Sequence, residues 1–375
     1  MSKGGERMDF YEKNGIIPYI NAHDTYTVYG GSRMAENTLQ AMKEAAASFV
    51  DLKQMQIQLG KKAAELTGNE AAYFTNGAEG ALLLCASICI AEDSEYYYRK
   101  LPEIAGTKRE FIVMRAQRNA YDAALAVSGA DIVEIGDADE TLEMELEGSI
   151  NEKTAGVVYF ASTLYQRGSL PLENVIAIAK KYKVPVIVDA AAQLPPKENL
   201  KRFTEAGADM VIFSGGKTLC GPQDSGVIFG TKQWIERCIR FGAPEHGICR
   251  VSKTSREAMA GLYTALENYV LQDEEKRECE LREILNRISE KIVKTEQEIM
   301  LKIVEQGPVG QKYPRLFCYL SEKNSSEKIV SFLRKERIYI GEDRINNAVY
   351  ISPLNLHKEE ADVVADVLCK ALEAE

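Results

Sequence analysis

Short apolar runs alternate with helix-like stretches through the first 230 residues. The runs lie at 71–74, 111–114, 131–135, 156–160, 184–189, 210–213 and 226–229. Each has the length and flanking residues of a buried strand. A parallel strand pair needs a crossover connection of a dozen or more residues, usually a helix. The alternation therefore predicts an α/β fold with a mostly parallel, doubly wound sheet.

The pattern changes after Gly230. A long, charged helical stretch begins near residue 255, and shorter strand and helix candidates follow it. A chain of 375 residues also exceeds one ordinary hydrophobic core. We expect an N-terminal segment at 1–35, a large domain at 36–254, a linking long helix at 255–295 and a smaller α+β C-terminal domain at 296–375.

Charge and composition narrow the function classes. The formal net charge of −10 disfavours a general nucleic-acid or anionic-membrane binder. The apolar run at 81–91 is too short to span a bilayer, and the first residues lack the apolar core of a signal peptide. The eight cysteines contain no CxxC pair, and the three histidines do not cluster. We expect a cytoplasmic protein with reduced thiols and no metal site.

Lys217 follows the run 210–213, at the carboxyl end of a predicted strand, where open α/β sheets place their ligands. A surface lysine in a glycine turn is the simplest alternative. A nucleotide-binding P-loop is another, because Gly216-Lys217-Thr218 matches the end of G-x-x-x-x-G-K-[ST]. That motif requires glycine at position 211, which is valine here, so the P-loop ranks well below a lysine that bonds to a cofactor.

Asp189 ends the neighbouring apolar run and precedes three alanines. A helix N-cap or a metal ligand is the alternative role. A buried carboxylate needs a cationic partner, and small side chains would let a flat ring approach closely. Together with Lys217, Asp189 predicts pyridoxal 5'-phosphate (PLP), with the lysine bonded to the cofactor and the carboxylate on the pyridine nitrogen. Ala191 and Gln193, in the same stretch, are expected cofactor contacts.

Two strand ends are candidates for holding the cofactor phosphate. The turn Asn76-Gly77-Ala78 joins a predicted strand to a helix, and the N–H groups of a helix N-terminus bind anions. Ser214 lies just before Lys217 and offers a hydroxyl. A glycine turn of this kind is common in α/β proteins, so this prediction depends on the lysine and the aspartate.

Loops after two further strands supply weaker candidates. Arg118 and Asn119 follow 111–114, where a side chain would stack on the cofactor ring or Arg118 would bind a substrate anion. A helix start capped by Asn119 explains the same residues equally well. Ser162 and Gln166 follow 156–160 and are candidates for the cofactor's ring hydroxyl or for the substrate.

Four stretches carry a family resemblance: 21–32, 66–72, 188–193 and 213–226, the last two being the most specific. Through them nearly the whole chain resembles PLP-dependent enzymes of the aspartate-aminotransferase fold (fold type I). Within that fold it is similar to the group of bacterial selenocysteine synthase and D-glucosaminate-6-phosphate ammonia lyase. The resemblance implies the roles given above for Lys217 and Asp189, and phosphate binding by Ser214 with the 76–78 turn. It also implies a homo-oligomer, at least a dimer, with the site at the subunit interface.

The ammonia-lyase branch resembles this chain more than the synthase branch does. The synthase carries an extra N-terminal domain for tRNA, whereas this acidic chain begins almost directly at the core. The resemblance implies a PLP-dependent carbon–nitrogen lyase that removes water from a 2-amino-2-deoxy sugar acid and yields a 2-keto-3-deoxy acid and ammonia. The alternatives are a PLP-dependent lyase or transferase acting on another amino acid, such as a β-substituted alanine, and a tRNA-dependent transferase. A PLP-binding regulator ranks last.

The elimination needs a base, an acid and cations for an anionic substrate. Lys217 would remove the C2 proton, and the lysine ammonium or Tyr121 would protonate the departing hydroxide. Arg33, Arg118 and Arg344 are candidates for the substrate carboxylate and phosphate. Each arginine is alternatively a solvated surface charge.

Overall fold

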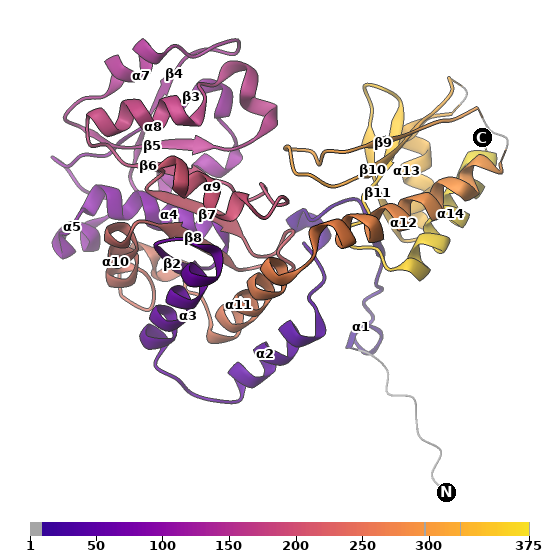
Figure 1. Ribbon diagram of the computed structural model, residues 1–375, viewed down its shortest axis with the longest axis horizontal. Helices are drawn as coiled ribbons and strands as arrows, with labels where there is room; N and C mark the ends of the chain where they lie inside the picture. The colour runs from indigo at the N-terminus through magenta and orange to yellow at the C-terminus, as the bar shows by residue number, and fades with distance from the viewer. Residues whose placement is uncertain (1–9, 296–297, 323, 375) are drawn as a thin grey trace, which may run out of the picture. The chain divides into compact units, whose positions relative to one another are not determined.

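The computed structural model describes residues 10–295, 298–322 and 324–374. These residues form two compact units. Figure 1 colours the chain by residue number from the N-terminus to the C-terminus. The large unit comprises 26–274 and 306–312, and the small unit comprises the described residues up to Thr25, together with 275–305 and those from Tyr313 onward. The chain therefore passes between the units four times, and neither unit is one continuous segment.

A seven-stranded sheet runs through the large unit. Its strands are β2 (Ala71–Thr75), β3 (Glu110–Met114), β4 (Asp131–Ile135), β5 (Thr154–Phe160), β6 (Val186–Asp189), β7 (Met210–Ser214) and β8 (Gly226–Gly230). Their order is β2-β8-β7-β6-β5-β3-β4. Strand β8 runs antiparallel to both its neighbours, and the other neighbouring pairs are parallel. The expected mostly parallel sheet is confirmed, and the carboxyl ends of its parallel strands share one edge.

Helices cover both faces of this sheet. They are α2 (Glu36–Ala46), α3 (Leu52–Thr67), α4 (Gly77–Ala91), α5 (Glu95–Lys100), α6 (Ala123–Val127), α7 (Glu143–Ser149), α8 (Leu172–Lys181), α9 (Asn199–Ala206), α10 (Lys232–Phe241) and α11 (Arg256–Leu271). Side chains alternate between the faces along each strand. Val211 and Phe213 of β7 therefore pack in one buried cluster, and Met210 and Ile212 pack in the other.

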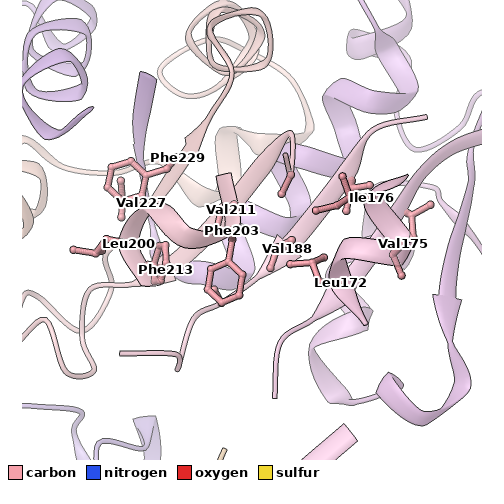
Figure 2. Packing of buried hydrophobic residues seen from close by; sticks show 14 of the residues in the cluster. Leu172, Val175, Ile176, Val188, Leu200, Phe203, Val211, Phe213, Val227 and Phe229 are labelled. Atoms are coloured by element: carbon pink, nitrogen blue, oxygen red, sulfur yellow. The ribbon is translucent and has the colours of Figure 1, made fainter. Parts of the chain in front are cut away.

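Figure 2 shows the first of these clusters, where strand side chains meet α8 and α9. Phe213 lies at the centre of a row of rings, with ring centroids 6.4 Å from Phe203 and 6.0 Å from Phe229. Burying one such side chain contributes about 1.5–3 kcal/mol. This packing fixes the strands whose carboxyl ends carry Asp189 and Lys217.

Helix α4 explains the apolar run noted in the sequence. Every residue from Ala81 to Ala91 is buried, because the helix packs against the sheet on one side and against α6 and α10 on others. A helix that is hydrophobic all round is a buried helix in a protein of this kind. Within the described residues, no helix is both long enough and apolar enough to span a membrane.

The small unit has its own five-stranded sheet. Its strands are β1 (Ile20–Ala22), β9 (Met300–Val304), β10 (Arg315–Tyr319), β11 (Ile338–Asp343) and β12 (Ala348–Ile351), in the order β1-β11-β12-β10-β9. Helices α12 (Glu274–Val293), α13 (Ser326–Lys335) and α14 (Lys358–Glu373) share a buried cluster with it. A short helix, α1 (Phe10–Lys13), precedes β1. The expected separate segment at 1–35 differs from this, because β1 pairs in parallel with β11.

The expected single helix at 255–295 is wrong. Two helices, α11 and α12, fill this range, and Gln272 between them has extended backbone angles (φ −67°, ψ 138°). Helix α11 packs on α2 and α3 in the large unit, whereas α12 belongs almost wholly to the small unit. No proline or glycine marks the break, so the local pattern reads as continuous.

Candidate active site

The strongest candidates lie together at one edge of the large sheet. Asp189 is the last residue of β6, Ser214 is the last residue of β7, and Lys217 follows in the next turn. Strands β6 and β7 pair in parallel, with Asp189 opposite Ile212. Lys217 lies close enough to Asp189 to act on its charge. The structure therefore brings together the acid and the lysine that the sequence predicted.

Asp189 is a buried carboxylate with few donors around it. The residue is 9% exposed, and burial raises the pKa of the carboxyl above its ordinary value. The Ala191 N–H, 2.9 Å from Oδ1, and the charge of Lys217 both oppose this rise in pKa, whereas Glu79 adds to it. Among the described residues, that N–H is the one hydrogen-bond donor to the carboxylate. The site thus leaves acceptor capacity for a cationic partner.

The turn that carries Lys217 is tightly packed. The Gly215 N–H donates to Ser225 O (2.8 Å), and the Cys220 N–H donates to Lys217 O (2.9 Å). A Cβ placed at Gly215 would lie 2.1 Å from Ser225 Oγ, and one placed at Gly216 would lie 2.5 Å from Gln223 Cα. Both glycines are therefore required by close approach of neighbouring atoms.

The β2–α4 turn has the form of an anion cradle. Asn76 is the N-cap of α4, but its side chain makes no capping hydrogen bond. Gly77 follows with φ +73°, and no atom lies within 4 Å of a Cβ added there. A helix N-terminus with open space beside its first residue suits a phosphate. Thr75, at the end of β2, and Ser214, at the end of β7, both pair with Gly226 of β8, so Ser214 lies on the same edge as this turn.

Ser252 is a neighbour of this cradle that sequence reasoning missed. It ends the 3-10 helix η5 (Ile248–Ser252), and its Cβ would lie 3.2 Å from a Cβ added at Gly80 in α4. Its hydroxyl donates to Cys249 O at 3.2 Å. No local pattern in the sequence connects residue 252 with residue 80, because the contact arises from the packing of η5 on α4.

Arg118 and Asn119 are both engaged within their own loop. The Arg118 guanidinium pairs with Asp122 at 2.5 Å and with Glu134, and these carboxylates raise its pKa. The Asn119 side chain accepts from the Tyr121 N–H at 2.8 Å, so the helix-capping interpretation describes its present contact. Tyr121, the candidate acid, is 53% exposed. Their cofactor and substrate roles stay predictions.

Ser162 and Gln166 lie in or beside the 3-10 helix η4 (Thr163–Gly168) after β5. Ser162 caps η4 by accepting from the Leu164 N–H at 3.2 Å, and Gln166 is exposed. Tyr165, between them, lies near Asp189 and Tyr121, and burial together with these two groups raises its pKa. Nothing in the local sequence pattern sets Tyr165 apart from its neighbours.

Ala191 and Gln193 follow Asp189 directly. The Ala191 backbone supplies the N–H that reaches Asp189. The Gln193 side-chain amide donates to Val309 O at 3.1 Å, and the Thr163 N–H donates to the same oxygen at 3.1 Å. The segment 306–312 is thereby fastened to the loops after β5 and β6, which places it beside the site.

Gln117 is a third residue that the sequence did not reveal. It is 1% exposed, at the end of η2 (Arg115–Gln117). Its amide nitrogen donates to Ser169 Oγ (3.1 Å), and its amide oxygen accepts from the Phe160 N–H (2.8 Å). Gln117 thus ties the loop after β3, which carries Arg118, to the end of β5.

The two remaining arginine candidates lie in different units. Arg33 is exposed on the large unit. Arg344 lies between β11 and β12 of the small unit and pairs with Glu342 at 3.0 Å. The substrate-binding roles of Arg33 and Arg344 stay predictions. Across the residues that the structure describes, no group of three or more His, Cys, Asp or Glu side chains is arranged to hold a metal ion.

The donor set fits PLP. A buried carboxylate with spare acceptor capacity suits a pyridinium nitrogen, a helix N-terminus and Ser214 suit a phosphate, and Lys217 supplies an amine beside them. The sheet order, with one antiparallel strand among parallel ones, supplies the matching scaffold. Fold and site together define a PLP-dependent enzyme of fold type I.

Comparison with known proteins identifies the family. Residues 26–311 match the L-seryl-tRNA selenium transferase family (SelA), and the chain belongs to it. It is 34% identical over 266 residues to D-glucosaminate-6-phosphate ammonia lyase of Salmonella typhimurium, covering 70% of each protein. It is 30% identical over 291 residues to 5'-C-glycyluridine monooxygenase-decarboxylase of a Streptomyces species, covering 76% of this chain and 71% of that protein. The solved structure of a D-glucosaminate-6-phosphate ammonia-lyase matches with a TM-score of 0.86 and 27% identity, over 98% of this chain and 99% of that one.

Proposed function

We propose that this protein is a PLP-dependent ammonia lyase acting on a 2-amino-2-deoxy sugar acid of the D-glucosaminate 6-phosphate type. The observation that carries the proposal is the buried Asp189 carboxylate beside Lys217, with one hydrogen-bond donor among the described residues. The full-length structural similarity to an ammonia-lyase supports this reaction over others in the family.

The residues divide the work of holding PLP. Asp189 would bind the ring nitrogen, and the N-terminal N–H groups of α4, at Gly77 and Ala78, would bind the phosphate together with Ser214. Lys217 would bond to the cofactor. Bound PLP supplies covalent attachment of the substrate amine and withdrawal of electrons from the carbon next to it.

Lys217 would be released from the cofactor when the substrate amine takes its place, and it then has two tasks at the substrate. Its Nζ accepts the proton from C2, and the resulting ammonium, or Tyr121, donates a proton to the C3 hydroxyl as it leaves as water. The released enamine hydrolyses to a 2-keto-3-deoxy acid and ammonia. The elimination releases one water and the hydrolysis consumes one, so the net reaction removes only ammonia from the substrate.

An anionic substrate requires cations, and Arg33, Arg118 and Arg344 remain the proposed ligands. Arg118 is the most constrained of them, because Asp122 and Glu134 already hold its guanidinium. Substrate binding through Arg118 would require it to leave one of these carboxylates. We also propose a cytoplasmic homo-oligomer, at least a dimer, with the site at the subunit interface. The chain's net charge of −10 supports a reaction without nucleic acid.

A second candidate is a transferase acting on seryl-tRNA, because the matching family bears that description. A PLP-dependent reaction on another amino acid, such as a β-substituted alanine, is the third. A gel shift with tRNA and a substrate panel containing both amino acids and amino-sugar acids would separate these three.

The first test is the visible absorption spectrum of the purified protein with PLP, before and after borohydride. We expect a visible band that bleaches on reduction. Peptide mass spectrometry should then locate the reduced cofactor on Lys217. Lys217→Ala should lose the trapped adduct and lower turnover by about 10³-fold or more. Release of ammonia and a keto acid from D-glucosaminate 6-phosphate should accompany wild-type turnover. A protein that takes up no PLP would refute the proposal.

A further inference from the structure

The stretch 21–32 carries part of the family resemblance, yet none of the roles above uses its last three residues. They follow η1 (Thr27–Tyr29) as Gly30, Gly31 and Ser32. In the large unit these residues lie against the turn that carries Lys217.

Hydrogen bonds and a close backbone approach join the segments. The Ser32 hydroxyl donates to Gly216 O at 3.1 Å. A Cβ placed at Gly31 would lie 2.7 Å from the same oxygen and 3.2 Å from Gln223 Cγ. Gln223 in turn donates from its side-chain amide to Thr27 O at 2.9 Å. Each segment thus donates one hydrogen bond to a backbone oxygen of the other.

Three successive carbonyls of the lysine turn are each bonded to a different donor. Gly215 O accepts from the Gly221 N–H, and Lys217 O accepts from the Cys220 N–H, both inside the turn. Gly216 O, between them, accepts from Ser32, which is 184 positions away in the sequence. The planar peptide that contains Gly216 O also contains the Lys217 nitrogen. Holding that oxygen therefore orients the peptide from which the lysine side chain projects.

We propose that Gly31 and Ser32 are positioning residues for Lys217. Ser32 fixes the Gly216–Lys217 peptide plane, and the missing side chain of Gly31 lets the segment come close enough for this hydrogen bond. The inference rests on the proposed role of Lys217. Displacing a reacting group by about 1 Å can lower a rate on the order of 10²-fold.

The chain contains a matched control for the glycine. Gly30 and Gly31 both have left-handed backbone angles, with φ +84° and +73°. Alanine at either position therefore incurs similar backbone strain. A Cβ at Gly30, however, has no atom within 4 Å, whereas one at Gly31 meets Gly216 O. Any difference between the two alanine variants reports the contact with the lysine turn.

The test compares Ser32→Ala, Ser32→Thr, Gly31→Ala and Gly30→Ala in the full-length protein stripped of PLP. Stopped-flow absorption measures the rate at which added PLP forms its imine with Lys217, and borohydride trapping with mass spectrometry identifies the lysine. The pH midpoint of the visible band reports the environment of the imine nitrogen. Circular dichroism checks that each variant is folded.

Ser32→Ala should slow imine formation about five- to tenfold, which is the effect of one lost hydrogen bond. Ser32→Thr should restore the rate to within about twofold, because it keeps the hydroxyl. Gly31→Ala should slow the reaction on the order of 10²-fold and shift the pH midpoint, while Gly30→Ala keeps the wild-type values.

Wild-type rates and midpoints in folded Ser32→Ala would overturn the inference. Equal behaviour of Gly30→Ala and Gly31→Ala would overturn the part played by Gly31. If Gly31→Ala does not fold, the Ser32→Ala and Ser32→Thr pair decides alone. Failure of the proposed function looks different, because borohydride would then trap PLP on another lysine or on none in the wild-type protein.

Discussion

Two aspartates of the large unit, next to or at the ends of adjacent strands, both have buried carboxylates but differ in the hydrogen bonds that these accept. Asp189 ends β6, and Asp209 precedes β7 at the opposite edge of the sheet. Burial raises the pKa of both carboxyls. Asp209 accepts from the Val186 N–H at 2.9 Å and from the Trp234 ring N–H at 3.2 Å, so both its oxygens are bonded. Among the residues described, the Asp189 carboxylate receives one N–H.

The difference indicates a structural role for Asp209 and supports the proposed cofactor-binding role of Asp189. Asp209 is bonded within the protein and fastens the start of β7 to β6 and α10. Asp189 retains an oxygen without a donor in the described structure, at the edge where Lys217 lies. Burying a charge with so few donors is unfavourable, and the charge of Lys217 only partly offsets this, so a pyridinium bound at Asp189 would supply a further cation.

Of the tests that compare the two aspartates, Asp189→Asn should give the largest change. It removes the charge that stabilises a protonated pyridine nitrogen, and we expect turnover to fall on the order of 10²–10³-fold. The free energy of unfolding of the PLP-free variant should be about 1 kcal/mol higher than that of the wild type at neutral pH, because the variant lacks a buried charge whose desolvation Lys217 only partly offsets. Steady-state kinetics and urea unfolding measure the two effects. Near-normal turnover would contradict the pyridinium assignment.

Asp209→Asn should behave in the opposite way. Its amide nitrogen would face an N–H donor, so we expect the free energy of unfolding to fall by about 1–3 kcal/mol. Turnover with saturating PLP should stay within about twofold of wild type, because Asp209 lies at the far edge of the sheet. A large loss of turnover at full stability would remove the distinction between the two aspartates.

The smallest effect is a dependence of stability on pH. Because burial raises both carboxyl pKa values, the folded PLP-free protein keeps protons that the unfolded chain has already lost above the ordinary value of 3.8. Its free energy of unfolding should therefore fall as pH rises from that value through the folded pKa values. Asp189→Asn should reduce this slope, and so should saturating PLP, which favours the charged carboxylate. Urea unfolding between about pH 4 and 7 measures the slope. An unchanged slope in Asp189→Asn would assign the effect elsewhere.

The local sequence pattern was sufficient to predict the candidate residues that lie at strand ends. Alternating strands and helices predict the sheet, and the carboxyl ends of parallel strands meet at one edge. Asp189, Ser214 and Lys217 could be found in this way, since each directly ends or follows an apolar run. The same rule placed the turn at Asn76 beside them.

Residues that act through tertiary packing could not be found in this way. Gln117 is a buried polar side chain whose partners, Phe160 and Ser169, come from another loop. Ser32 bonds to a carbonyl far along the chain. Neither contact leaves a periodic signal, because hydrogen bonds between loops depend on how the sheet brings distant segments together. The break at Gln272 could not be predicted for a related reason. It depends on α11 packing in one unit and α12 packing in the other.

Because the chain passes between its units four times, the order of synthesis constrains when each unit can be completed. Residues 306–312 complete the large unit, where Val309 O bonds to the Thr163 N–H and the Gln193 side chain. A ribosome has therefore synthesised α12 and β9 of the small unit before the large unit is complete. The small unit, in turn, uses β1 from the beginning of the chain. No single cut yields two whole units, so folding of each must wait for part of the other to emerge.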